Sequence, residues 1–188
     1  MDFGVNWEPG IGDPTVMGWV TVLAYVVAAG LAAAAARALD RVADPDARGR
    51  QPEIWRLTTI LLVALAINKE LDLQSWFTAF ARVVLKKQGW MEYHRILQFR
   101  FIVGLICVSL IFLIASAWCT RRRRREYWLL LLGETFTVTF IVLRAASFHH
   151  VDVLLGTHIV GVKVNWALEL TGIGVIALAA WTRRRSAP

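Results

Sequence analysis

Cysteine is scarce in this sequence. Only two cysteines, Cys107 and Cys119, occur among the 188 residues, and both lie in one apolar block. The rise of 1.5 Å per residue places them about 18 Å apart on a helix, which is too far for a disulfide within that block. No CxxC pair is present, so the sequence argues against a thiol-redox motif and against a cysteine-bound cluster.

The N-terminal residues lack the basic region that opens a secretory signal. They read MDFGVNWEPGIGDP and carry an excess of acidic side chains, so we expect the first apolar block to stay in the mature protein. No internal repeat of about 20 to 50 residues is visible, and no low-complexity linker divides the chain. A single domain over residues 1–188 is expected for this length.

Apolar residues are abundant and occur in long blocks. They make up 57% of the chain and the mean hydropathy is +0.51, whereas soluble domains are about half apolar. Each block is near the ~20 residues that a helix needs to cross about 30 Å of hydrocarbon, and lipid forces the backbone to satisfy its own hydrogen bonds. The sequence therefore predicts an all-α integral membrane protein, a five-helix transmembrane bundle. The expected spans are near 16–38, 57–75, 99–118, 128–146 and 164–181.

Arginine is concentrated in alternate connections and in the tail. The residues concerned are Arg37, Arg41, Arg48, Arg50, Arg56, Arg121 to Arg125, and Arg183 to Arg185. Five crossings place all of them on one side, which the positive-inside rule identifies as the cytoplasm, with the N-terminus outside. A four-span topology, with the second or fifth block in the interface, stays open. The basic pI of about 10.1 follows from this orientation, so we expect the lipid bilayer and no nucleic acid as a partner.

A short amphipathic helix is expected on the outer surface, near residues 76–87. Trp76, Phe80 and Val83 recur there at helical spacing, with Arg82 among them, a pattern typical of an interfacial helix. The alternative is that the second span continues as a long helix that protrudes from the bilayer.

Ionisable residues interrupt the second apolar block. Asn68 lies roughly 17 Å along a helix that starts at Leu57, near or beyond the middle of the bilayer. A charged side chain at the centre costs on the order of 2.5–3.5 kcal/mol, so Lys69 and its acidic neighbours need partners from other helices. We expect a polar cluster in the outer leaflet. Its expected members are Lys69, Glu70, Asp72, Arg144 and Glu169, with Arg100 at the rim.

The same leaflet holds further groups that could act on a ligand. Arginine holds phosphate or carboxylate through paired hydrogen bonds, and ionisable groups in a low-dielectric rim can act as acids and bases. The ligand-binding candidates are Asn68, Gln74, His94, Arg95, Arg100, Arg144 and Glu169. The catalytic candidates are Lys69, Glu70, Asp72 and His149.

Histidines on the outer side raise the question of a metal ion. The candidate ligands are His149, His150, Asp152 and His158. Imidazole with carboxylate suits zinc, iron or copper, but adjacent histidines on a helix point about 100° apart. The alternative is that these histidines bond to lipid headgroups and loop carbonyls. Haem is not expected, because bis-histidine ligation needs facing helices inside the membrane.

Two functions of different classes fit these features. The first is binding or processing of an anionic or lipid-linked ligand at the outer polar site, and whether the protein is an enzyme stays open. The second is an accessory or assembly subunit with a membrane-protein partner or in a homo-oligomer, in which the polar cluster is structural. Gly18, Gly30 and the run from Ala32 to Ala36 give the first span a small-residue surface for close helix packing.

The stretch INKELDLQSW, followed by GWMEYHRILQ, resembles a group of small bacterial multi-pass membrane proteins of uncharacterised function. The pattern of that group is Asn-Lys-x-Leu-Asp-Leu-Gln, then a Gly-Trp turn, then Arg and Gln. The matching residues are Asn68, Lys69, Leu71, Asp72, Leu73, Gln74, Gly89, Trp90, Arg95 and Gln98. The resemblance covers about residues 55 to 150 and implies a bacterial inner-membrane location. Members sometimes carry the label of isopropylmalate isomerase, which does not transfer, because the two cysteines cannot hold the iron–sulfur cluster of such an enzyme.

Overall fold

Long α-helices make up most of the structure, a computed structural model that describes residues 14–42, 51–71, 94–146, 158–159 and 162–186. The elements are α1 (Val16–Asp40), α3 (Gln51–Leu71), α5 (His94–Cys119), the 3-10 helix η2 (Arg121–Arg123), α6 (Arg124–Ala146), the strands β1 (His158–Ile159) and β2 (Val162–Lys163), and α8 (Val164–Ser186). The two short strands pair antiparallel, with His158 opposite Lys163. The prediction of an all-helical fold is confirmed for the described residues apart from this small pair of strands. The amphipathic helix expected near 76–87 lies outside them.

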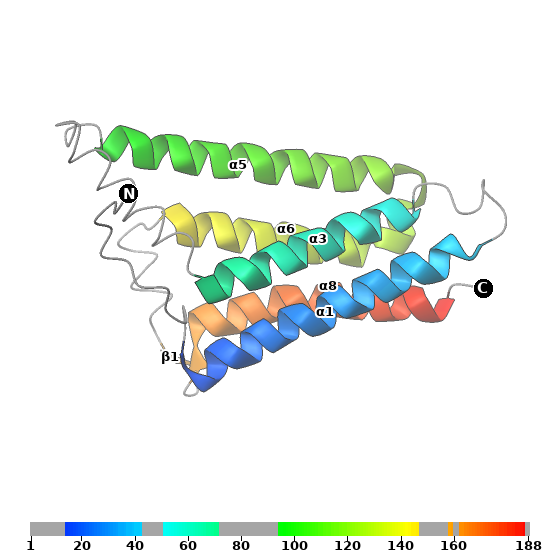
Figure 1. Cartoon of the computed structure of the whole chain (residues 1–188). Helices are drawn as coiled ribbons and strands as arrows, with labels where there is room; N and C mark the ends of the chain where they lie inside the picture. Colours follow the sequence, from blue (N-terminus) through cyan, green and yellow to red (C-terminus); the bar gives the residue numbers. More distant parts are fainter. Residues whose placement is uncertain (1–13, 43–50, 72–93, 147–157, 160–161, 187–188) are drawn as a thin grey trace, which may run out of the picture.

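Successive long helices run in opposite directions, as Figure 1 shows. α1 packs against α3 and α8, α8 also packs against α6, and α5 lies on α6 with a smaller contact to α3. Two ends of the bundle can therefore be distinguished. At the Glu169 end, α3 and α6 finish and α8 begins; at the arginine end, α1 finishes, α3 begins and α8 finishes.

The arginine end gathers the basic residues of two connections and the tail. The arginines among the described residues there are Arg37, Arg41, Arg56, Arg121 to Arg125, and Arg183 to Arg185. Arg56 donates to Asp40 at 2.7 Å, which ties the start of α3 to the end of α1. The end of α1, the start of α3, the turn between α5 and α6 and the end of α8 therefore share one end of the molecule, as the sequence predicts.

α1 packs through its alanines. The hydroxyl of Thr15 caps the helix by accepting from the backbone N–H of Gly18 at 3.1 Å, which satisfies one of the otherwise unpaired first-turn donors. Ala28, Ala32 and Ala35 are completely buried at helical spacing. Their small side chains let α3 and α8 approach closely. Gly30, expected on the same packing surface, is exposed instead, and a Cβ there would meet nothing within 4 Å.

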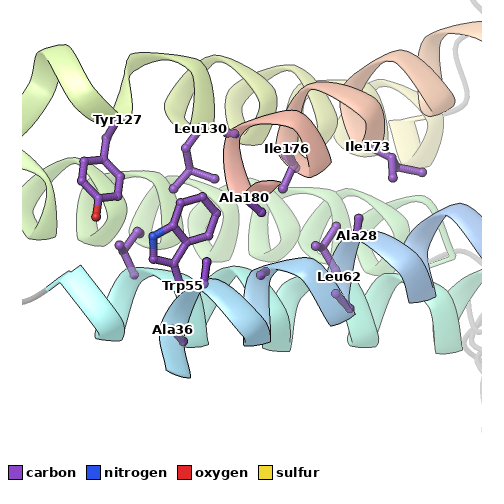
Figure 2. Close-up of a cluster of buried hydrophobic side chains, with 14 of the residues drawn as sticks. Ala28, Ala36, Trp55, Leu62, Tyr127, Leu130, Ile173, Ile176 and Ala180 are labelled. Carbon is purple, nitrogen blue, oxygen red and sulfur yellow. The ribbon is translucent and has the colours of Figure 1, made fainter. Parts of the chain in front are cut away.

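The apolar core lies between α1, α3, α6 and α8, and Figure 2 shows its larger side chains. Trp55 and Leu62 of α3 and Ile176 of α8 are almost fully buried. The ring of Trp55 packs tilted against the ring of Tyr127 at the start of α6, with centroids 6.0 Å apart. α6 and α8 are especially close at Gly133, where an added Cβ would lie 2.8 Å from a side-chain carbon of Ile176.

Three of the described helices are long and apolar enough to cross a membrane. These are Val16–Asp40, Ile102–Cys119 within α5, and Val164–Arg185 within α8. The segment of α5 is only 6% buried, and Ile111 and Ile114 on it are 67% and 66% exposed. An apolar helix surface of this extent is suited to contact with lipid rather than water. The length and composition of these three helices are consistent with a membrane protein.

Candidate functional site

Glu169 is the centre of a buried polar cluster at the Glu169 end, and four helices contribute to it. Lys69 of α3 donates to one carboxylate oxygen, Oε2, at 3.0 Å, and the phenol of Tyr25 on α1 donates to Oε1 at 3.1 Å. Arg144 of α6 places a guanidinium nitrogen 3.9 Å from Oε2. Because Glu169 belongs to α8, this one carboxylate links α1, α3, α6 and α8. We call these four residues the Glu169 cluster.

The two cations of the cluster differ in their exposure. The side chains of Lys69 and Glu169 are 6% and 5% exposed, so their ion pair is buried. Removing both charges from water is costly, and only close contact and further hydrogen bonds offset that cost. The Arg144 side chain is 44% exposed, and its longer contact is weakened by solvent. Lys69 is therefore the main partner that neutralises Glu169, and Arg144 adds a second positive charge beside it.

Helix geometry explains why Lys69 and Glu169 meet. Lys69 lies eight residues after Leu61 and four after Leu65, so these three share one face of α3. Leu65 packs against the apolar core, and the lysine continues that inward-facing row. On α8, Glu169 is followed by Ile173 and Ile176, both buried, at helical spacing. The apolar residues fix the rotation of each helix, and the charged residues follow them inward.

The structure brings together three of the residues that the sequence predicts for the polar cluster: Lys69, Arg144 and Glu169. Glu70 is half-buried, and Asn68 and Arg100 are exposed. The described contacts do not join these three to Glu169.

The other candidates lie at the starts of described elements or outside the described residues. His94 and Arg95 form the first turn of α5, at the Glu169 end, with side chains that are not described. His158 is the first residue of β1. The candidates outside the described residues are Asp72, Gln74, His149, His150 and Asp152. Among the described residues, no group of three or more metal-ligating side chains comes together, so the expected histidine site stays a prediction.

Tyr25 is the member of the cluster that the sequence did not reveal. Tyrosine is common at membrane interfaces and is not a charged residue, so it gives no signal that a partner is required. Its neighbour Thr21, one turn earlier, is also buried and returns its hydroxyl to the carbonyl of Met17 at 2.8 Å. Two polar residues one turn apart on the alanine-rich face are the only sequence sign that this face meets polar groups of another helix.

A second buried polar cluster lies further toward the arginine end. Glu134 of α6, Thr58 of α3 and Ser116 of α5 are all completely buried. The hydroxyl of Thr58 lies 2.7 Å from Oε1 of Glu134 and 2.9 Å from the carbonyl of Ile54. Within the described residues, Oε2 of Glu134 and the hydroxyl of Ser116 have no hydrogen-bond partner.

Counting hydrogens identifies the form of Glu134 that fits these contacts. Thr58 has one hydroxyl hydrogen but two neighbouring acceptors, the carbonyl of Ile54 and Oε1 of Glu134. If the carboxyl of Glu134 carries a proton, it donates to Thr58, and Thr58 donates to Ile54. Each hydrogen then has one acceptor, and no charge is buried without a counter-ion.

A third polar group closes the arginine end. The phenol of Tyr127 donates to Oε1 of Gln51 at 2.9 Å, and a guanidinium nitrogen of Arg183 donates to the same oxygen. Arg183 also pairs with Glu126 at 3.2 Å and lies over the Tyr127 ring, 5.6 Å from its centroid. Burial raises the pKa of the Tyr127 phenol above its usual value, so this group donates throughout the ordinary pH range. These contacts join α3, α6 and α8 just outside the apolar core.

The Glu169 cluster is better suited to hold an anion than to move protons. Glu169 accepts from Tyr25 and Lys69 and is paired with Arg144, so this carboxylate is not a free base. Arg144 reaches it only at 3.9 Å, and its guanidinium carries five N–H donors in a planar fork. A phosphate or carboxylate beside Arg144 could accept two of these hydrogens at once.

Comparison with protein-family models, with curated proteins and with solved structures finds no match to this chain. The chemistry of the described side chains is therefore the basis on which a function can be proposed.

Proposed function

We propose that this protein binds an anionic headgroup, from a lipid or a lipid-linked molecule, at the Glu169 end of a membrane-spanning bundle. The observation that carries the proposal is the position of Arg144. Lys69 already neutralises Glu169 at 3.0 Å, and the half-exposed guanidinium of Arg144 adds a second positive charge 3.9 Å from the same carboxylate. The exposed N–H donors of this guanidinium are the groups from which a phosphate or carboxylate of the ligand would accept.

In this proposal all five long helices cross the bacterial inner membrane. α3 has 21 residues and α6 has 23, which correspond to about 32 and 35 Å of helix and are sufficient for a hydrocarbon core of about 30 Å. The buried Lys69 is paired within the bundle, as an ionisable group in a span should be. The arginine end faces the cytoplasm and the N-terminus lies outside, so the Glu169 cluster belongs to the outer leaflet.

The members of the cluster have different roles in this proposal. Arg144 contacts the ligand, whereas Lys69 and Tyr25 hold Glu169 in place. Because Lys69 and Glu169 are buried and bonded to each other, binding rather than turnover is the function that the geometry supports best. Processing of the ligand by the catalytic candidates, Lys69, Glu70, Asp72 and His149, stays a proposal that needs an assay of its own.

Binding of a soluble headgroup tests the role of Arg144. The purified full chain in mild detergent is titrated with radiolabelled glycerol phosphate, which carries the anion without a lipid chain. Loss of a charged hydrogen-bond donor is worth about 1.5–3 kcal/mol, so Arg144→Gln is expected to weaken binding roughly tenfold or more. Arg184→Gln removes the same charge at the arginine end and is expected to bind as the unmodified protein does. Absence of binding to the unmodified chain, or equal binding by Arg144→Gln, contradicts the proposal.

The alternative, an accessory or assembly subunit, is favoured by one observation. The apolar segment of α5 is hardly buried within the bundle, so a helix of a partner could cover it as well as lipid could. A stoichiometric partner protein after purification in mild detergent, lost on Ile111→Arg in α5, would support this function. A chain that purifies alone and binds glycerol phosphate supports the first.

A further inference from the structure

An apolar groove runs between α3, α5 and α6. Its volume is about 270 Å³, and its lining is almost free of polar atoms. Ile60 of α3 and Val108 of α5 line it and are each 65% exposed. The groove therefore opens at the surface of the bundle, beside α5, which has a smaller contact with α3 than with α6.

The groove leads toward the Glu169 cluster. On α3 its lining includes Leu61 and Leu65, and Lys69 continues the same helix face one turn further on. On α6 its lining includes Ile141, three residues before Arg144. One helical turn is about 5.4 Å, so the two cations of the cluster stand about one turn beyond the end of the apolar lining.

Buried polar side chains lie about one turn beyond the opposite end of the apolar lining. Glu134 lies one turn before the lining residue Val138 on α6, and Ser116 lies one turn after the lining residue Phe112 on α5. Both are completely buried. From Leu57 to Leu65 the lining of α3 extends for about 12 Å, which approaches half the hydrocarbon thickness of about 30 Å. The groove therefore has the depth of a single leaflet.

We propose that this groove holds one acyl chain of an anionic phospholipid of the outer leaflet, with the phosphate of that lipid on Arg144. The inference rests on the proposed function, since it assigns the lipid-bearing class of ligand to the same anion site. Chemical complementarity supports a phospholipid: the groove is apolar, and the half-exposed guanidinium of Arg144 stands about one turn beyond its lining. A helix is about 10–12 Å across and could only rest on the rim of a groove of this volume, whereas an extended chain can enter it.

A photoactivatable lipid provides the test. The full chain is reconstituted in vesicles that contain phosphatidylglycerol with a diazirine in one acyl chain, and photolabelled peptides are quantified by mass spectrometry. Ala64→Phe fills the groove from α3, and Val63→Phe adds an aromatic ring at the next position, which is exposed and does not line the groove. Labelling of α5 and α6 peptides at the groove is expected to fall roughly tenfold in Ala64→Phe and to stay unchanged in Val63→Phe.

The headgroup and the acyl chain can be separated in the same set of variants. Ala64→Phe is expected to bind soluble glycerol phosphate as the unmodified protein does, whereas Arg144→Gln is expected to lose both glycerol phosphate and groove labelling. Undiminished labelling in Ala64→Phe, equal labelling by a phosphatidylcholine probe, or a partner protein over the groove overturns the acyl-chain inference. Failure of glycerol phosphate to bind overturns the proposed function itself.

Discussion

The carboxylate of Glu169 pairs with two cations that come from different helices, Lys69 of α3 and Arg144 of α6. Lys69 is 8% exposed as a residue, and its ammonium group lies 3.0 Å from Glu169. A buried pair of this kind is weak evidence for net stabilisation, because an apolar pair of similar volume often replaces it without loss. Breaking the pair is different, since the remaining charge stays in the protein interior without a counter-ion.

Removal of one member of this pair is therefore expected to destabilise the protein more than removal of both. Glu169→Gln should lower the free energy of unfolding by about 3–5 kcal/mol, because the buried ammonium group of Lys69 loses the carboxylate with which it is paired. Lys69→Met combined with Glu169→Gln should recover most of that loss, since no uncompensated charge remains. Unfolding in mixed detergent micelles with increasing dodecyl sulfate measures both values. A double variant no more stable than Glu169→Gln would show that the ion pair is not what Glu169 contributes.

Glu134 gives a second prediction at the scale of one side chain. If its carboxyl is protonated, Glu134→Gln keeps both the shape and a donor toward Thr58, and the free energy of unfolding should change by less than about 1 kcal/mol. Glu134→Leu leaves the Thr58 hydroxyl without this partner and should cost about 1–3 kcal/mol. The same unfolding assay compares the two variants. Equal and large losses for both would mean that a carboxylate anion is required at this position.

The buried charges of the cluster are easier to predict from the sequence than the partners they contact. Lys69, Arg144 and Glu169 could be selected because a charge in an apolar run needs compensation. The choice among compensating groups depends on the rotation of each helix and on the distance between helices, and neither is encoded in hydropathy. For that reason Glu70 and Arg100 were expected in the cluster and are not joined to Glu169 by the described contacts, whereas Tyr25 was not expected and donates to it.

At the scale of the helices, α6 and α8 approach each other closely where α6 carries a glycine. A Cβ on Gly133 of α6 would lie 2.8 Å from Cγ1 and 3.1 Å from the backbone nitrogen of Ile176 on α8. Backbone atoms cannot move aside cheaply, so the two helices would have to separate. Gly174 on α8 offers a matched position, because a Cβ there would meet nothing within 4 Å.

Substitution by alanine is expected to have different effects on stability at Gly133 and at Gly174. Gly133→Ala is expected to lower the free energy of unfolding by about 1–3 kcal/mol through overpacking. Gly174→Ala is expected to be neutral, or to stabilise by up to about 1 kcal/mol, because alanine has the higher helix propensity. Thermal unfolding of the purified chain followed by circular dichroism measures both. If Gly133→Ala were as stable as Gly174→Ala, α6 and α8 would not be in the close contact described here.

The start of a helix could be predicted where an apolar block begins at the same residue. It could not be predicted where polar residues or proline form the first turn. The first and last helices begin at Val16 and Val164, as the apolar blocks indicate. α3 begins at Gln51 instead of near 57, because Pro52 is favourable in the first turn of a helix and Glu53 favours the positive N-terminal end of the helix dipole. Hydropathy does not detect these two residues, since Glu53 is charged and Pro52 belongs to a residue type that breaks a helix when it lies in the interior.

The whole molecule combines a tightly packed part and a loosely packed helix. α1, α3, α6 and α8 share the apolar core, and the Glu169 cluster connects the same four helices. α5 lies outside this arrangement (Figure 1). The apolar groove lies between α5, α3 and α6. The order in which helices pack cannot be deduced from the sequence, because each apolar block could adjoin any other. The exposure of α5 and the groove beside it are therefore findings of the structure alone.

The direction of the bundle in the membrane is the property on which the outer position of the Glu169 cluster depends. Alternating helices bring the end of α1, the start of α3, the turn between α5 and α6 and the end of α8 to the arginine end (Figure 1), and an excess of arginine marks the cytoplasmic side. In bacteria, a green fluorescent protein fused after Pro188 should fluoresce, whereas alkaline phosphatase fused there should be inactive. Phosphatase fused within the connection between α3 and α5 should be active, because the five crossings that we propose would place that connection outside. An active phosphatase at the C-terminus would place the arginine end outside, and the anion site would then face the cytoplasmic leaflet.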